Sequence, residues 1–193
     1  MSNQHIVLQA AVYTAQRIIA EQPKNRVFHN LHHTITVLEG AGKIGRAENL
    51  KEVELQMVLL AAVFHDLGHI ECYSGHEEVS KRLANEWLTA QNYPEEKIAM
   101  ILGCIGATRI PQNPKNILEE VVCDADLIHL SFESYPIYRE MLRSEWEKEL
   151  GLVYTDEEWI ANNNKFLMEH SYFTAYGKNT LEPKKVNVSN IYS

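Results

Sequence analysis

The chain has 193 residues, and its formal net charge at pH 7 is −8. Hydrophobic residues make up 45% of it and charged residues 23%, which is typical of one soluble globular domain with a substantial core. The acidic balance argues against a general nucleic-acid binder, because no basic excess exists to neutralise a polymer's phosphates. A small phosphorylated substrate remains compatible with it, since that substrate needs only a local positive site.

Cysteine usage and the N-terminus bear on the compartment. Cys72, Cys104 and Cys123 show no CxxC spacing, and their odd number argues against a complete disulfide framework. The N-terminus lacks a charged segment followed by an apolar one, and no apolar run approaches the length of a membrane span. We therefore expect reduced thiols and a cytoplasmic protein that does not enter a membrane.

The first third of the chain predicts three helices. Apolar residues at helical spacing predict the first over residues 5–20. A second carries the apolar stripe of residues 35–38, and the glycines of residues 40–45 predict a loop after it. A third, over residues 49–67, is expected to stop at Gly68, since glycine commonly ends helices.

The remaining chain is also helical by pattern. Further helices are expected over residues 76–88, from residue 94 onward, and over residues 116–127, 135–150 and 155–170. Two prolines make residues 108–114 a loop, and residues 178–193 receive no assignment. No stretch alternates as strands do, so we predict an all-α fold, a single-domain helical bundle over residues 1–193.

A histidine and an aspartate stand side by side at the end of the third helix. The segment 64–69 reads Phe-His-Asp-Leu-Gly-His and closes the apolar run of residues 57–64. The side chains of His65 and Asp66 are costly to bury there unless something pairs with them. A divalent metal ion would satisfy both, because imidazole nitrogen and carboxylate oxygen are both metal ligands.

Other residues of the same kinds stand where further ligands are needed. His29 and His33 are four residues apart, so on a helix they face the same way. Asp124 and Asp126 lie late on another apolar helix, where a carboxylate is rarely left unpaired. A mixed His/Asp set of this type suits Mn, Fe, Zn, Mg or a similar divalent ion and needs no thiolate.

The order of these residues resembles that of a known superfamily. His33, then His65-Asp66, then Asp126 resembles the H…HD…D signature of the HD-domain superfamily of metal-dependent phosphohydrolases. Residues 28–34, Phe-His-Asn-Leu-His-His-Thr, resemble the YHNxxH version found in a subgroup of predicted phosphohydrolases. A similar HNxxH…HD order occurs in cyclic-nucleotide phosphodiesterases.

The resemblance covers residues 26–130 and continues more weakly through residues 169–174. It implies an HD-type helical bundle with its metal-site core at about 26–130 and C-terminal helices at about 134–177. It is specific for the superfamily, because four elements occur in the right order, and much less specific for a substrate.

The resemblance also implies roles. The matching metal ligands are His33, His65, Asp66 and Asp126. Asp126 matches better than Asp124, because the family's aspartate usually follows alanine and precedes an apolar residue. His29 matches the general acid of the phosphodiesterase-like members, and Asp66 joins it as a catalytic residue that could bridge to a second ion.

Several roles stay open. Arg26 and Arg109 are candidate phosphate clamps, because guanidinium binds phosphate bidentately, although a solvated role is about equally expected. For His69 and for His76, a role in the site and a place on the surface are equally expected. The late histidine of dinuclear relatives is missing from residues 98–112, so one tightly held ion is expected. We predict that His129 is a surface residue and that the tryptophans belong to the core (Trp87, Trp146 and Trp159). The roles of Asp124 and His170 stay undecided.

The leading hypothesis is a metal-dependent hydrolase of a small phosphate ester, such as a nucleotide or cyclic nucleotide. We expect no nucleic-acid polymer and no membrane as partners. Two alternatives remain: an HD-type di-iron oxygenase, against which the missing late histidine counts, and a non-catalytic nucleotide-binding regulatory module. The sequence leaves the substrate, the metal and the oligomeric state undetermined.

Overall fold

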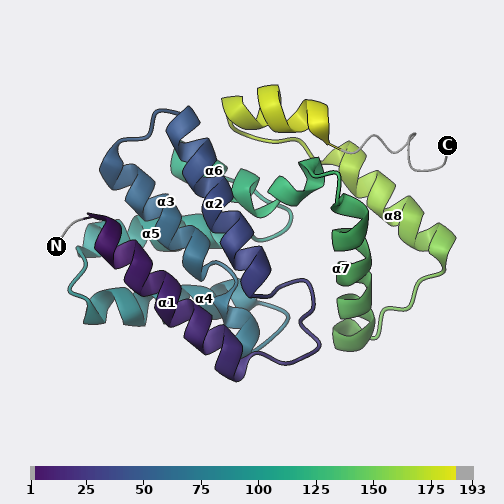
Figure 1. The fold of residues 1–193 in the computed structure, drawn as a ribbon, viewed down its shortest axis with the longest axis horizontal. Helices are drawn as coiled ribbons and strands as arrows, with labels where there is room; N and C mark the ends of the chain where they lie inside the picture. The colour runs from purple at the N-terminus through teal and green to yellow at the C-terminus, as the bar shows by residue number, and fades with distance from the viewer. Residues whose placement is uncertain (1–2, 186–193) are drawn as a thin grey trace.

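The fold comes from a computed structural model that describes residues 3–185; residues 1–2 and 186–193 of the predicted domain lie outside the described residues. Between residues 3 and 185 the chain forms α-helices joined by helical turns and loops, with no strand (Figure 1). The α-helices are α1 (Asn3–Glu21), α2 (Leu31–Ala47), α3 (Glu52–Phe64), α4 (His76–Ala90), α5 (Glu95–Ala107), α6 (Ile117–Asp126), α7 (Tyr135–Leu150) and α8 (Asp156–Glu169). Shorter helical turns are η1 (Leu67–Ile70), η2 (Ile128–Ser131), η3 (Gly177–Leu181) and η4 (Glu182–Lys184). The predicted all-α class is confirmed.

Several helix ends are capped by side chains or by glycine. The Asn30 side chain accepts hydrogen bonds from the backbone N–H groups of His32 and His33, which begins α2 directly beside the candidate ligands. Thr155 forms a capping box with Glu158 at the start of α8. Gly151 ends α7 in the left-handed conformation, with φ of 66°.

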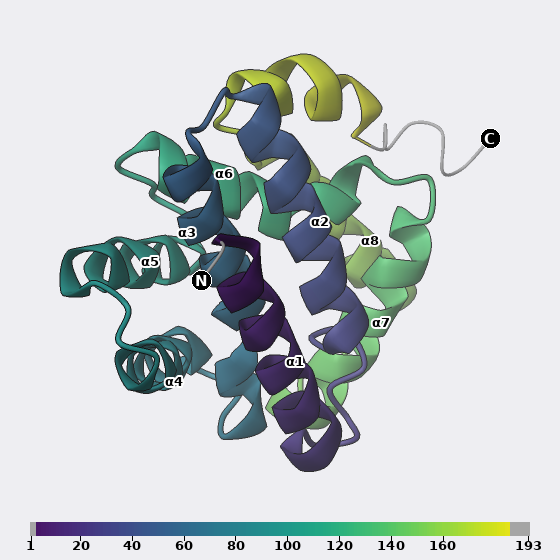
Figure 2. The same cartoon turned by 60° about the vertical axis from the view of Figure 1, so that its left-hand side comes forward.

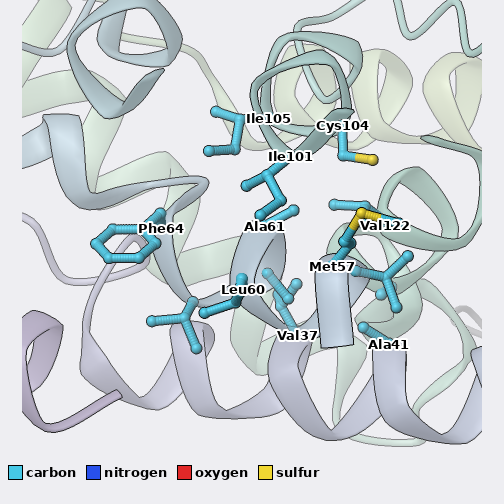
Figure 3. Close-up of a cluster of buried hydrophobic side chains, with 14 of the residues drawn as sticks. Val37, Ala41, Met57, Leu60, Ala61, Phe64, Ile101, Cys104, Ile105 and Val122 are labelled. Carbon is cyan, nitrogen blue, oxygen red and sulfur yellow. The ribbon is translucent and has the colours of Figure 1, made fainter. Parts of the chain in front are cut away.

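The core is built around α3. This helix is apolar on nearly every side, so it must be surrounded, and α1, α2, α5 and α6 pack on it. Figure 3 shows Met57, Leu60, Ala61 and Phe64 of α3 among side chains of the neighbouring helices. Residues Glu52–Ile70 are long and apolar enough to cross a membrane, but 78% of this stretch is buried inside the protein, as in a core helix.

The predicted loop at residues 40–45 is wrong, because this stretch belongs to α2. A Cβ at Gly40 would lie 3.1 Å from Ile128 Cδ1, and one at Gly45 would lie 2.9 Å from Leu55 Cδ1. The glycines therefore allow close packing of α2 against its neighbours. That packing outweighs the modest helix-breaking tendency of glycine.

The third helix is shorter than predicted. It runs from Glu52 to Phe64, and a turn and η1 follow it. Gly68 does not end it in a left-handed conformation; a Cβ there would overlap the backbone carbonyl oxygen of His76. Glycine is needed because η1 contacts the start of α4 closely, and this contact brings residues 65–69 next to His76.

The helices lie on two sides of α2. Figures 1 and 2 show α4 and α5 on one side and α7 and α8 on the other. After α8 the chain returns to α6, where the Asp124 carboxylate accepts hydrogen bonds from the backbone N–H groups of Phe173 and Thr174. The Tyr172 hydroxyl donates to the carbonyl oxygen of Leu127 at 3.0 Å. These contacts hold the C-terminal segment against the end of α6.

Candidate metal centre and the cavity beside it

The four predicted metal ligands converge from three places in the fold. His33 comes from the first turn of α2, His65 and Asp66 from the turn after α3, and Asp126 from the end of α6. Each offers a ligand atom, and these atoms all lie within 4.8 Å of one another. His65 is 0% exposed and His33 2%, so the cluster is largely shielded from water.

The distances within the cluster show nitrogens and oxygens directed at a common point. Asp66 Oδ2 lies 3.2 Å from His33 Nε2 and 3.1 Å from His65 Nε2. Asp126 Oδ1 lies 3.2 Å and 3.5 Å from the same two nitrogens. The two Nε2 atoms are themselves 3.3 Å apart. A divalent cation suits such a set, because it would interact with all four ligands at once.

Two further observations fit a cation. His65 Nδ1 lies 2.8 Å from the carbonyl oxygen of Ala62 and donates its proton there, so Nε2, which faces the cluster, is the nitrogen that a metal ion would bind. Metal-binding histidines are usually oriented in this way by a second hydrogen bond. Asp66 Oδ2 is buried and has no well-directed hydrogen bond among the described residues. The donor set therefore matches a divalent metal ion.

The charges of the cluster stabilise one another. Burial alone would raise the pKa of Asp66, but the charge of His65 and the close contacts with the ring nitrogens of His33 and His76 hold this pKa well below its usual range. Burial alone would lower the pKa of His65, but Asp66 and Asp126 raise it well above its usual range. The cluster thus favours positive charge between its carboxylates, and a bound cation would replace the imidazole protons.

A cavity of about 400 Å³ lies beside the cluster. Its lining includes a polar group, here called the metal wall, of His29, Asp66, His69, His76 and Asp126. It also includes a mainly aromatic group from α7 and α8, here called the aromatic wall, of Tyr135, Tyr138, Leu142, Trp146, Trp159 and Phe166. A cavity lined by both polar and apolar groups suits a small ligand with a charged part and an organic part.

The roles left open for His69 and His76 are clarified by their position, because both line the cavity. The ring centroids of His69 and His76 are 3.8 Å apart, and the ring of His29 also stacks on His69, with its centroid 4.3 Å away. His76 Nε2 lies 3.2 Å from Asp66 Oδ1. Burial and the charge of His29 hold the pKa of His69 well below its usual range, and neither of its nitrogens has a hydrogen-bond partner among the described residues. His29, Asp66 and His69 form a second group of three that could hold an ion.

The two candidate arginines differ in placement. Arg109 is exposed and lines the cavity, as a phosphate clamp requires. Arg26 is only 7% exposed, pairs with Glu149 of α7, and lies over the ring of Tyr73 at 4.8 Å. It is not among the residues that line the cavity. Arg139, which the sequence reasoning did not single out, does line it.

Glu145 is the main site residue that sequence reasoning missed. Its carboxylate is 0% exposed and accepts hydrogen bonds from the backbone N–H groups of Phe28 at 2.8 Å and His29 at 3.2 Å. It also pairs with His29 Nδ1. The one available signal is helical spacing, because Glu145 continues the face of α7 that carries Tyr138 and Leu142.

Three other residues complete the comparison. The predicted surface position of His129 is wrong: it is buried against the ring of Phe28, and burial together with the charge of His33 lowers its pKa to about 3. Asp124 is fully buried and anchors the C-terminal segment, away from the ligand group. His170 is half-buried and does not line the cavity.

The fold and the site together define an all-helical protein with a buried His/Asp cluster. The HD domain family model matches residues 30–131, more than half of the chain, and the chain belongs to this family. The crystal structure of a predicted HD superfamily hydrolase from an uncultured Thermotogales bacterium is similar in fold, with a TM-score of 0.56. The two sequences are 20% identical, and the similarity covers 83% of this chain and 91% of that chain. No match was found among curated proteins.

Proposed function

We propose that the protein is a metal-dependent hydrolase of a small phosphate ester. The observation that carries this proposal is the convergence of His33, His65, Asp66 and Asp126 beside a cavity of ligand size. A divalent ion held by these four residues would supply Lewis-acid activation of water and of the phosphoryl group. Mn, Fe, Zn and Mg are all candidates for this ion, because the donor set combines imidazole and carboxylate.

The chain's own residues account for the other requirements of hydrolysis. Arg109 and Arg139 line the cavity and would neutralise phosphoryl oxygens. As water oxygen forms a bond to phosphorus, the bond to the leaving oxygen breaks and its electron pair stays on that oxygen. His29 donates a proton to the leaving oxygen, and the proton lost by the attacking water restores His29. The net products are an alcohol and a phosphate.

The aromatic wall supports a nucleotide or cyclic nucleotide as the ester. Trp146 is half-buried and lines the cavity, and it packs edge to face on the buried ring of Trp159, with ring centroids 5.5 Å apart. Aromatic side chains stack on nucleobases, at about 1–3 kcal/mol per base. The likeness of residues 28–34 to the YHNxxH pattern agrees with a phosphohydrolase. The buried free thiols of Cys104 and Cys123 agree with a reducing, cytoplasmic location.

Elemental analysis of untagged protein tests the proposal, paired with hydrolysis of a panel of phosphomonoesters and phosphodiesters. We expect about one divalent ion per chain and phosphate release that depends on it. The Asp66→Ala variant should lose both. Full metal content and full hydrolysis in that variant, or no metal in either protein, would refute the proposal.

A di-iron oxygenase is the second candidate function. The second group of possible ligands, His29, Asp66 and His69, favours it, because a dinuclear site needs ligands for two ions. Two irons per chain, iron-dependent oxygen consumption and no phosphate release would select this alternative. Tight nucleotide binding without turnover under any metal would instead indicate a regulatory module.

A further inference from the structure

The contact between Glu145 and His29 joins two distant parts of the chain. Glu145 lies on α7, beyond the residues matched by the HD domain model, and His29 lies just before α2, one residue ahead of the match. The two segments run side by side in Figure 1. A fully buried carboxylate requires compensation, and three N–H groups of residues 28 and 29 supply it.

This contact fixes a proton on Nδ1 of the His29 ring, the nitrogen that faces α7. Burial alone would raise the pKa of Glu145, but hydrogen bonds from His29 and from two backbone N–H groups lower it, so the carboxylate is ionised. An ionised carboxylate only accepts hydrogen bonds, so the proton of this contact belongs to His29 Nδ1. Nε2 is then the nitrogen left to interact with a substrate, since His29 lines the cavity.

The orientation of the His29 ring is held from two directions. Glu145 binds the ring edge and also the backbone N–H of His29, so the ring and its own backbone are tied to one carboxylate. The stacked ring of His69 lies against its face at 4.3 Å, with an angle of 28° between the planes. Rotation of the imidazole would break the first contact and disturb the second.

We propose that Glu145 is a positioning residue, which holds His29 with Nε2 directed at the leaving oxygen of the substrate. This inference rests on the proposed hydrolase function. When the bond between phosphorus and the leaving oxygen breaks, its electron pair stays on the oxygen and His29 Nε2 gives up the proton. Glu145 keeps its hydrogen bond to Nδ1 throughout and does not itself become protonated. It stabilises the charged imidazole before the transfer.

Glu149 provides a matched control on the same helix. It lies one turn beyond Glu145 and pairs with Arg26, so it also ties α7 to the segment before α2. Its partner is Arg26 and not His29. Replacing either glutamate with glutamine removes one buried or half-buried carboxylate and keeps the side-chain size. Only Glu145→Gln removes the acceptor from His29 Nδ1.

The test compares two esters that differ in the leaving group. A general acid matters most for a poor leaving group, such as an alkyl alcohol, and little for 4-nitrophenol, which departs without a proton. Both proteins are loaded with metal. Relative to the wild type, Glu145→Gln should hydrolyse the alkyl ester about 100-fold more slowly or worse. We expect less than about tenfold loss with the 4-nitrophenyl ester. His29→Ala should give the same pattern, and the double variant should lose little more.

The control should behave differently. Glu149→Gln should change both rates by the same small factor. Equal losses on the two esters in Glu145→Gln would reduce Glu145 to a structural anchor and overturn the proposal.

A measurement without turnover separates this inference from the proposed function. Nitrogen-15 NMR of the histidine rings reports which nitrogen carries the proton. We expect a proton on His29 Nδ1 in the wild type and in Glu149→Gln, and a changed signal in Glu145→Gln. An unchanged His29 signal in Glu145→Gln would overturn the positioning role even if the protein hydrolyses esters. The expected NMR change without any ester hydrolysis would refute the hydrolase function and leave the role of Glu145 as an orienting residue.

Discussion

The two walls of the cavity are built in different ways. The metal wall uses polar side chains from the turn after α3, from η1, from the start of α4, from the end of α6 and from the segment before α2. The aromatic wall uses side chains from α7 and α8, which lie on the other side of α2 (Figure 1). Only the first lies mostly within the residues matched by the HD domain model. The proposed chemistry and the proposed choice of substrate therefore reside in different segments, and mutations should separate them.

The largest effect is expected at the metal wall. Asp66 lies within 3.2 Å of nitrogens from His33, His65 and His76. In Asp66→Ala we expect loss of bound metal and a fall in the rate of hydrolysis of more than about 100-fold. This exceeds the loss of about 10- to 100-fold that is typical when a residue behind a metal ligand is replaced. Elemental analysis and initial rates measure both. Retained metal with normal rates would mean that the cluster is a structural ion-pair network.

The ligand group was predictable because it depends on order and on helical spacing. The apolar run before His65 predicted that a buried helix ends there. Asp126 was chosen because it matches the last aspartate of the H…HD…D order. The loop error at residues 40–45 had little effect on this prediction, since His33 lies before it. Regular helices carry such residues to the same place in the core even where one predicted boundary is wrong.

The aromatic wall was not predictable by the same reasoning. Trp146 and Trp159 lie among aliphatic residues at helical spacing and were both predicted to be core. This is correct for Trp159, which is only 1% exposed, whereas Trp146 is half-buried and lines the cavity. An aromatic face has the same pattern whether it packs on another helix or faces a cavity, so only the tertiary structure distinguishes the two. Glu145 was missed for a related reason: its partner is the segment before α2, more than 100 residues earlier in the chain.

Asp124 sharpens the comparison, because it lies on α6 only two residues before Asp126. It accepts three hydrogen bonds from Phe173 and Thr174 and is fully buried. In Asp124→Ala those donors lose their partner, and we expect the free energy of unfolding to fall by about 3 kcal/mol. Metal content per folded chain should stay unchanged. Chemical denaturation and elemental analysis decide, and metal loss without destabilisation would contradict this assignment.

Trp146 tests the aromatic wall. In Trp146→Ala we expect KM for a nucleoside monophosphate to rise by about tenfold, the equivalent of one lost stacking contact of about 1.4 kcal/mol. KM for methyl phosphate should stay the same, because its organic part is too small to reach the aromatic wall.

Trp87→Ala is the control for that experiment. Trp87 packs on Phe64 and Tyr13, with ring centroids 5.5 Å and 5.9 Å away, and does not line the cavity. Its replacement should lower stability while leaving the ratio of the two KM values unchanged. Equal KM changes for both esters in Trp146→Ala would place the organic group elsewhere.

The smallest effect concerns His170, where the chain leaves α8 and returns toward α6. Burial, followed by the charge of Lys185, lowers its pKa to about 4, against the opposing charges of Glu182 and Asp126. An unfolded histidine has a pKa of about 6.5, so between these values the unfolded state binds more protons and stability falls as the pH falls. Because His170 is only half-buried, we expect the wild type to lose about 1 kcal/mol more than His170→Gln between pH 7 and pH 5. Denaturation at the two pH values measures this difference. Equal pH slopes for the two proteins would mean that His170 accepts its proton within the fold, and that the return from α8 is open to water.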